Sequence, residues 1–176
     1  MANAIFNSFK RDIQSGAIDL DTDTIKVMLV TSSYTPDIDA HDKRDDITNE
    51  VAGTGYSAGG ASLANKSVTA DNTNDRGVFD ADDLTWGSST ITARGAVIYK
   101  SRGGASSADE LIAYIDFGSD KSSSSTVRRA WRTRCVLVLI FIPSATGVTH
   151  EAESPRPPSI STRQTRQAPM ACTSSR

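Results

Sequence analysis

A histidine flanked by carboxylates comes nearest, in this sequence, to a residue group that performs acid–base chemistry. His41 lies between Asp39 and Asp42, and an imidazole beside a carboxylate can accept and return a proton near neutral pH. No nucleophile or second histidine in a matching motif accompanies it. We therefore interpret His41 as a solvated histidine in a charged surface segment, residues 32–50.

Two further segments resemble ligand-binding loops but miss the required spacing. Residues 19–23 read DLDTD, yet Thr24 and Val30 stand where a calcium loop needs Gly and a bidentate Glu. Residues 51–60 read VAGTGYSAGG, and their glycines match neither the dinucleotide fingerprint nor a P-loop. We predict a polar turn in the first segment, with cation binding as the disfavoured alternative, and glycine turns in the second.

The cysteines and an arginine-rich segment are the remaining candidates for a metal, disulfide or ligand-binding site. Cys135 and Cys172 give neither a zinc-site spacing nor a disulfide framework. Four arginines between Arg128 and Arg134 suit phosphate oxygens, but only Trp131 is there to stack on a base, so nucleic-acid binding is not expected. No residue is assigned as catalytic, cofactor-binding or metal-binding. The sequence predicts a protein that is not an enzyme and uses no cofactor.

The clearest strand patterns lie in residues 84–117. Apolar and small residues occupy every second position from Ile91 to Tyr99, and the alternation resumes from Leu111 to Phe117. Small and polar residues at 101–109 join the two segments, so we predict an antiparallel hairpin with one buried face. Because two strands alone are marginally stable in water, other elements must cover that face.

The rest of the first 125 residues predicts a mainly β fold. Asn3 is the expected N-cap of a short helix that Gly16 ends, and Trp86 is expected in the core. Further elements are strands at residues 24–31 and 63–69, a turn at 71–75, and a short helix near 40–47. Short strands at this spacing predict an antiparallel β-sandwich or small barrel with one N-terminal α-helix; five to seven strands are expected.

Charge divides the chain into two segments. Residues 1–125 contain 11 Lys and Arg against 19 Asp and Glu, about −8, whereas residues 126–176 contain eight Arg, no Lys and two Glu, about +6. We predict a β-rich domain over 1–125 and an atypical Arg-, Pro- and Ser-rich extension over 126–176. The start has no secretory-signal pattern, and the longest apolar run, residues 135–142, is far shorter than the roughly 20 residues of a membrane helix. A soluble protein with no membrane contact is expected.

Five phrases, spread in order over residues 1–123, carry a resemblance to a known family. They are GAIDLDTDTIKVMLVTSSYTPD at 16–37, NEVAGTGYSAGGASLANKSVT at 49–69, VFDADDLTW at 78–86, ITARGAVIYK at 91–100 and LIAYIDFGSD at 111–120. They closely resemble small structural proteins encoded in tailed-bacteriophage genomes and prophages. The resemblance implies a virion protein assembled in the host bacterial cytoplasm, with the major capsid protein or other virion proteins as partners. It also implies a head decoration or cement protein, with a neck or tail component as the competing expectation, and brings no catalytic residues. Such proteins assemble as symmetric copies, so a homo-oligomer is expected.

The extension departs from that family, whose members end soon after the serine run at 122–125 with one more strand containing Thr and Trp. We hypothesise a shift of reading frame near Ser125, because Asp and Lys disappear there while Arg, Pro and Cys increase. Residues 136–142, VLVLIFI, have high β propensity and are expected to pair with the sheet in place of that strand. Residues 151–176 lack the apolar groups needed to offset the entropy cost of ordering, so they are expected to be disordered unless a neighbouring chain holds them.

A function from another class is also considered, a carbohydrate-binding module on the virion surface. Its candidates for stacking on sugars are Tyr34, Tyr56 and Trp86. This hypothesis requires the three rings to be exposed.

Overall fold

The computed structural model describes residues 2–124, 131–133 and 136–139. Strands account for 41% of the residues and helices for 11%, so the prediction of a mainly β fold with one N-terminal α-helix is confirmed. The described residues form ten strands, more than expected, because several are only two or three residues long.

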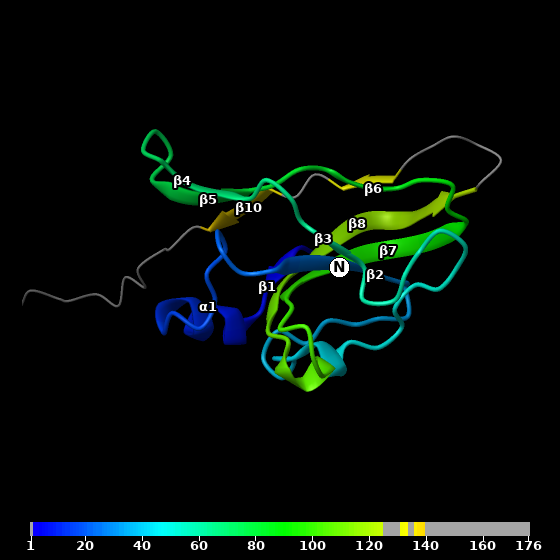
Figure 1. Cartoon of the computed structure of the whole chain (residues 1–176), viewed down its shortest axis with the longest axis horizontal. Coiled ribbons are helices and arrows are strands. Elements are labelled where there is room, and N and C mark those ends of the chain that lie inside the picture. The colour runs from blue at the N-terminus through cyan, green and yellow to red at the C-terminus, as the bar shows by residue number, and fades with distance from the viewer. Residues whose placement is uncertain (1, 125–130, 134–135, 140–176) are drawn as a thin grey trace, which may run out of the picture. The chain divides into compact units, whose positions relative to one another are not determined.

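The largest sheet has five antiparallel strands (Figure 1). Their order is β1 (Ala4–Ile5), β8 (Leu111–Ser123), β7 (Ile91–Lys100), β2 (Ile25–Val30) and β3 (Ala61–Ser62). The predicted hairpin is confirmed as β7 and β8, with Val97 opposite Tyr114 and Ile98 opposite Ala113. The strand predicted at 24–31 is confirmed as β2, which pairs with the other side of β7.

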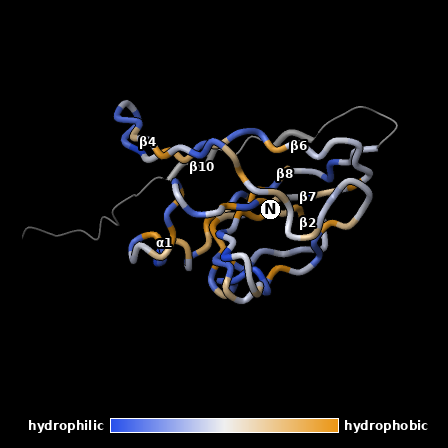
Figure 2. Tube along the Cα trace, in the orientation of Figure 1, coloured by the Kyte–Doolittle hydropathy of each residue, from blue (hydrophilic) through white to orange (hydrophobic). Residues whose placement is uncertain are grey.

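Both faces of this sheet are buried, whereas the sequence predicted one. From Gly95 to Lys100 every residue of β7 is buried, and the apolar segments of Figure 2 run along β2, β7 and β8. Alternating strand residues therefore enter two separate apolar clusters: Ile98 faces one, and Val97 and Tyr99 face the other. The prediction failed because it assigned residues 32–50 to the surface, while this segment covers the second face.

The first cover consists of short strands, and we call the side beneath it the strand-covered face. One three-stranded sheet has the order β10 (Val136–Leu139), β5 (Arg76–Asp80) and β4 (Ser67–Asp71), and a two-stranded sheet joins β6 (Leu84–Trp86) to β9 (Trp131–Thr133). Phe79 of β5 and Trp86 of β6 lie in one buried cluster with Val27 of β2. These small sheets therefore pack on the large one as the second layer of an antiparallel sandwich, and the prediction of Trp86 in the core is confirmed.

The second cover is the segment 31–50, and we call the side beneath it the loop-covered face. The segment holds one short 3₁₀ helix, η1 (Arg44–Asp46), which lies in contact with a second, η2 (Ser106–Ala108), in the β7–β8 connection. Tyr34 from this segment is buried among Met28, Val97 and Tyr99. A segment that reads as polar thus contributes a large ring to the core.

Helix α1 (Asn7–Gln14) begins later than predicted. Asn3 is not its N-cap: β1 follows directly, pairing Ala4 with Tyr114, and the Asn3 side-chain oxygen accepts a hydrogen bond from the Asp116 N–H at 2.9 Å. The predicted end is confirmed, since Gly16 follows the helix with φ +72°, a conformation that favours glycine.

Residues 63–69 do not form the single strand predicted. Strand β3 ends at Ser62 and β4 begins at Ser67, and between them Asn65 has φ +48°. The break moves the chain from the large sheet to the three-stranded sheet. The predicted turn after Asp71 is confirmed, because it joins β4 to β5 as a hairpin with Asp71 opposite Arg76.

Two segments beyond residue 125 pair with earlier strands. Val136–Leu139 pair with β5, as expected for part of the VLVLIFI segment, and Trp131 lies opposite Trp86. The chain divides into a compact unit, Met1–Ile142, and a second unit, Pro143–Arg176, which lies outside the described residues. The disorder expected for residues 151–176 stays a prediction, because these residues lie outside the described part of the chain.

Candidate interaction surface

His41 is a structural residue of the loop cover. Its Nδ1 atom lies 3.0 Å from the Tyr34 hydroxyl oxygen, and the two rings stack with centroids 5.8 Å apart. The ring is half-buried, so the histidine predicted to be solvated is only partly exposed. Its contacts hold the segment around Tyr34 and leave no carboxylate paired with the imidazole among the described residues.

The DLDTD segment is the polar turn that was predicted. One carboxylate oxygen of Asp19 accepts the N–H groups of Asp21 and Thr22, at 3.0 and 3.3 Å, and Asp23 forms an ion pair with Lys100 at 2.7 Å. In the part of the chain that the structure describes, no group of three or more His, Cys, Asp or Glu is placed to hold a metal ion.

The glycines of residues 51–60 form turns that approach strands closely. A Cβ atom on Gly60 would lie 1.9 Å from the carbonyl oxygen of Val27, and one on Gly53 would lie 2.4 Å from that of Thr90. These positions need glycine because other backbone fills the space. The turn interpretation is confirmed.

The three aromatic candidates for sugar stacking are not available as an exposed platform. Tyr34 is 1% exposed and Trp86 6% exposed. Tyr56 is half-buried against Trp86; its hydroxyl donates to a Glu50 carboxylate oxygen at 2.7 Å and accepts the Leu29 N–H at 3.0 Å. Burial raises the pKa of both Tyr34 and Tyr56. The carbohydrate hypothesis therefore lacks its binding surface.

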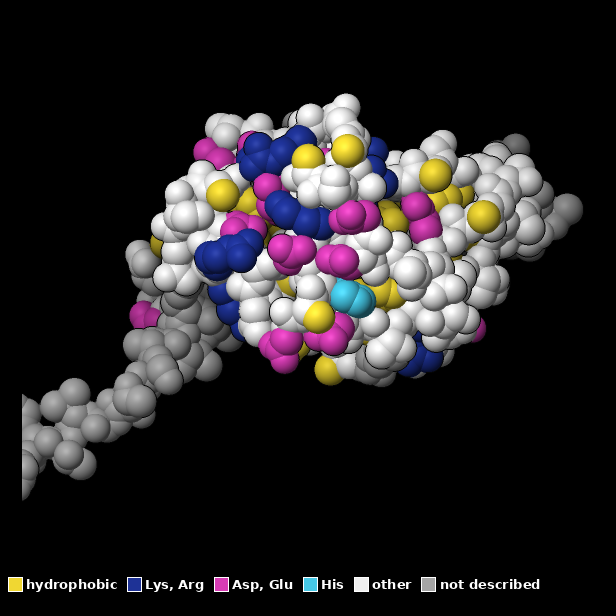
Figure 3. Space-filling view, turned by 90° about the horizontal axis from the view of Figure 1, so that it is seen from below, with side chains coloured by type: hydrophobic (Ala, Val, Ile, Leu, Met, Phe, Trp, Pro, Cys, Tyr) yellow, Lys and Arg dark blue, Asp and Glu magenta, His cyan; other side chains and the backbone are white. Residues whose placement is uncertain are grey.

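Five charged side chains fasten the loop cover to the β7–β8 hairpin, and we call them the loop clamp: Lys43, Arg44, Arg102, Asp109 and Glu110. Arg44 Nε lies 2.7 Å from an Asp109 carboxylate oxygen, and Lys43 and Arg102 reach the Glu110 carboxylate at 3.2 and 2.8 Å. Figure 3 shows acidic and basic side chains close together on this side of the molecule. The clamp joins residues more than sixty positions apart.

Burial and pairing act against each other in the loop clamp. Burial favours the neutral form of Glu110, but the hydrogen bonds from Arg102 and Lys43 together outweigh it and lower the pKa of Glu110. The Arg44 guanidinium lies 5.5 Å from the Tyr99 ring centroid, and burial raises the pKa of Tyr99 to about 12. These shifts are those of a structural ion-pair network, and the carboxylates in it are already occupied by cations.

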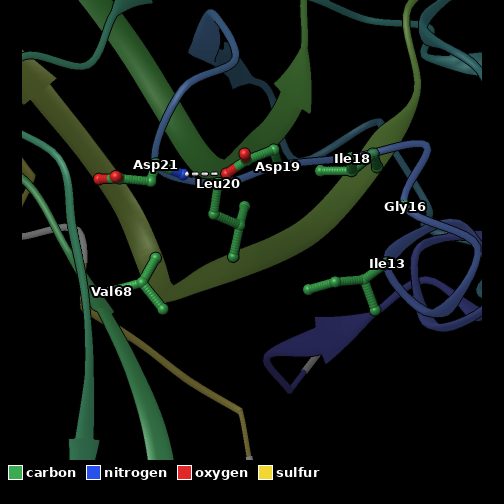
Figure 4. A pocket seen from close by; sticks show the side chains of 7 residues that line it. All are labelled: Ile13, Gly16, Ile18, Asp19, Leu20, Asp21 and Val68. Carbon is green, nitrogen blue, oxygen red and sulfur yellow. Dashed lines mark hydrogen bonds between the residues drawn. The ribbon is translucent and has the colours of Figure 1, made fainter.

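An apolar groove opens on the strand-covered side (Figure 4). We call it the Val68 groove; it has a volume of about 390 Å³ and is lined by Ile13, Gly16, Ile18, Asp19, Leu20, Asp21 and Val68. Helix α1 supplies Ile13, the turn after that helix supplies residues 16–21, and β4 supplies Val68. In Figure 4 the Val68 and Leu20 side chains point into the same space.

The groove is open because β4 is the last strand on its side of the three-stranded sheet. Val68 lies directly opposite Phe79 of β5, so both side chains project from the same face, toward the core. Phe79 is fully buried, yet Val68 is 53% exposed. The interior of the sandwich is therefore uncovered along β4.

The rim of the groove is acidic. Hydrogen bonds from the Thr22 side chain and from the N–H groups of Asp21 and Thr22 lower the pKa of Asp19, so this carboxylate is ionised at neutral pH. Within the described residues, neither Asp19 nor Asp21 forms an ion pair with a lysine or arginine. The Val68 groove thus combines an apolar floor with two rim carboxylates that have no salt bridge to Lys or Arg in the described residues, although that of Asp19 is engaged in hydrogen bonds of its own turn.

The sequence did not point to this surface. The sequence predicts Val68 inside a strand over 63–69, and Asp19 and Asp21 only in a turn. The one available signal was an isolated valine between the polar residues Ser67 and Thr69. Such a pattern does not distinguish a buried valine from an exposed one.

Comparisons with known proteins identified no similar protein. A scan against models of protein families, a search of curated proteins and a search of solved structures each gave no match. Among the described helices, none has the length and apolar character needed to cross a membrane. The resemblance to phage structural proteins therefore stays a prediction that depends on the five quoted phrases.

Proposed function

We propose that this chain is a structural protein of a tailed-bacteriophage virion that acts by binding other proteins, as a decoration or cement protein of the head. The observation that carries this proposal is the pairing of an open strand edge, β4, with the Val68 groove. An open strand edge presents backbone groups with which a segment of another protein can pair. The five phrases supply the virion context.

The mechanism proposed is attachment without chemistry. Packing of Phe79 against the five-stranded sheet would hold the three-stranded sheet and its β4 edge in place, and the major capsid protein or another virion protein would bind there. Repeated copies on a symmetric shell would each make the same contact. A stable contact of this type buries about 800 Å² on each partner.

Quantitative mass spectrometry of purified particles tests the proposal. Particles should be prepared from the phage or prophage whose genome encodes this chain, with and without a deletion of its gene. We expect the chain in fixed proportion to the major capsid protein, and we expect particles without it to lose DNA at a lower temperature. A copy number of one ring per particle would instead indicate a neck or tail component. Absence from the particle would disprove the virion function altogether.

A further inference from the structure

Strand β4 has the features of an acceptor for an added strand. It ends the three-stranded sheet, its residues Ser67 to Ala70 are exposed, and only β5 pairs with it among the described residues. An unpaired edge presents backbone N–H and C=O groups that a second extended segment can satisfy. With five residues, β4 is longer than β1 and β3, the two-residue edge strands of the large sheet.

The geometry of a sheet dictates where the side chains of such an added segment would go. A strand added to β4 would lie roughly 4.8 Å beyond it, and its residue opposite Val68 would project toward the same side as Val68. That side is the Val68 groove, where Ile13, Leu20 and Val68 form the apolar lining. An apolar side chain at this position would therefore cover the open interior of the sandwich.

Charge decides between kinds of added segment. Asp19 and Asp21 line the groove without a salt bridge to Lys or Arg in the described part of the chain, so basic side chains beside the apolar one could pair with them. Asp21 is the more available of the two, because the Asp19 carboxylate already accepts hydrogen bonds from Asp21 and Thr22. Residues 1–125 of a second copy are a poor match, because they carry 19 acidic against 11 basic residues, whereas its basic residues 126–176 would suit the charge and are an outcome that the dimer measurement below tests. An acidic or proline-rich segment would be repelled or could not complete the backbone pairing.

We propose that β4 and the Val68 groove bind an extended segment of another protein, in which an apolar residue flanked by Lys or Arg pairs with β4 and fills the groove. This inference rests on the proposed function, since it names the chemistry of the partner segment that such a structural protein would hold. It specifies backbone pairing at Ser67–Asp71, an apolar contact at Val68 and ion pairs at Asp19 and Asp21.

Selection of random 12-residue peptides on the immobilised full-length chain tests this inference. We expect the enriched peptides to alternate apolar and polar residues and to carry Lys or Arg near the central apolar position. Val68→Lys should weaken their binding about tenfold or more, because it places an ammonium group in the apolar contact. The matched control is Ile38→Lys, at the other exposed large apolar residue of the described chain, which should change binding less than about twofold.

Two further measurements separate strand addition from simple groove binding. Hydrogen exchange should slow at the amides of Ser67–Asp71 when a selected peptide is added, since pairing protects edge amides. The double variant Asp19→Asn/Asp21→Asn should bind about three- to tenfold more weakly and with a flatter salt dependence, whereas Asp120→Asn should leave both unchanged. Circular dichroism checks each fold, and Val68→Ser replaces Val68→Lys if the latter alters the spectrum.

Several results would overturn the inference. They are failure to enrich any peptide, enrichment of acidic or proline-rich peptides, equal binding by wild type and Val68→Lys, and absence of exchange protection at β4. A concentration-dependent dimer abolished by Val68→Lys would assign the edge to self-association instead. The composition of the particles distinguishes the two proposals. If Val68→Lys protein is incorporated into particles normally, the contact at β4 is disproved and the virion function stands. If the chain binds peptides but is absent from particles, the virion function is disproved and the contact at β4 stands.

Discussion

The two faces of the five-stranded sheet are covered in different ways. On the loop-covered face a single segment, residues 31–50, is fastened by the ion pairs of the loop clamp and by the buried ring of Tyr34. On the strand-covered face short strands pack through Phe79 and Trp86, and their outer edge stays open. A loop cover depends on polar contacts at a few fixed points, whereas a strand cover depends on apolar packing and leaves backbone groups free at its margin. Among the described residues, the strand cover ends in an unpaired edge at β4.

The largest effect should come from the apolar packing of the strand cover. Phe79→Ala removes a fully buried ring from the cluster that joins the two layers, and we expect the free energy of unfolding to fall by about 3–5 kcal/mol. Urea unfolding followed by circular dichroism measures it. The exposed control Ile38→Ala should change stability by less than about 0.5 kcal/mol. A loss below about 1 kcal/mol for Phe79→Ala would show that the two layers do not share a core.

A smaller but clear loss should follow from opening the loop clamp. Asp109→Asn removes the negative partner of Arg44 while keeping an acceptor for the Arg102 N–H, which lies 2.7 Å from the Asp109 carboxylate. We expect a loss of about 2–3 kcal/mol, because Arg44 is left partly buried without its counter-charge. Limited proteolysis should then cut first within residues 31–50. Cleavage first in β4 or β5 would contradict the assignment of the clamp to the loop cover.

The pH dependence of stability should also reflect the loop clamp. The pKa of Glu110 is lowered from 4.5 in the folded chain, so its pairing stabilises the fold above that value and is lost as the pH falls through the folded-state pKa. Wild-type stability should therefore decline as the pH drops below 4.5, and Glu110→Gln should decline less steeply. Urea midpoints at a series of pH values provide the test. Parallel curves for the two proteins would mean that Glu110 is not preferentially ionised in the fold.

The smallest effect on stability should come from the open edge. Val68 is half-exposed, so Val68→Thr, which keeps the branched shape and the β propensity, should change the free energy of unfolding by less than about 0.5 kcal/mol. The same change should weaken binding of the peptides selected above. Thermal unfolding and peptide titration on one protein sample compare the two effects. A loss above about 2 kcal/mol would mean that Val68 serves the fold as a core residue.

The sequence predicted those parts of the fold that have strict periodicity. The β7–β8 hairpin followed from alternation between Ile91 and Phe117, and the end of α1 followed from Gly16. Alternation did not reveal that β7 is buried on both sides, since Lys100 reads as solvent-facing but its ammonium group is paired with Asp23 and the Ala17 carbonyl oxygen. Burial of a charged residue depends on distant partners that local spacing does not show.

Other parts were missed because the deciding contact is non-local. Tyr34 lies in a segment without periodicity, and it is buried among residues of β2, β7 and β8 that are far away in the chain. Asn3 has the right chemistry for a helix cap, but pairing of Ala4 with Tyr114 takes that stretch into the sheet. The Val68 groove is lined by residues from α1, from the turn after it and from β4, so no one segment indicates it.

Glu50 joins the two covers at the rim of the large sheet. It forms a bridge with Val30, and one of its carboxylate oxygens accepts both the Tyr56 hydroxyl at 2.7 Å and the Gly59 N–H at 2.6 Å. Just before it, Ile47 packs on the loop-covered side; just after it, Val51 enters the opposite cluster. Loss of this carboxylate would therefore leave the Tyr56 hydroxyl and the Gly59 N–H without their acceptor, at the point where the chain passes from one face of the large sheet to the other.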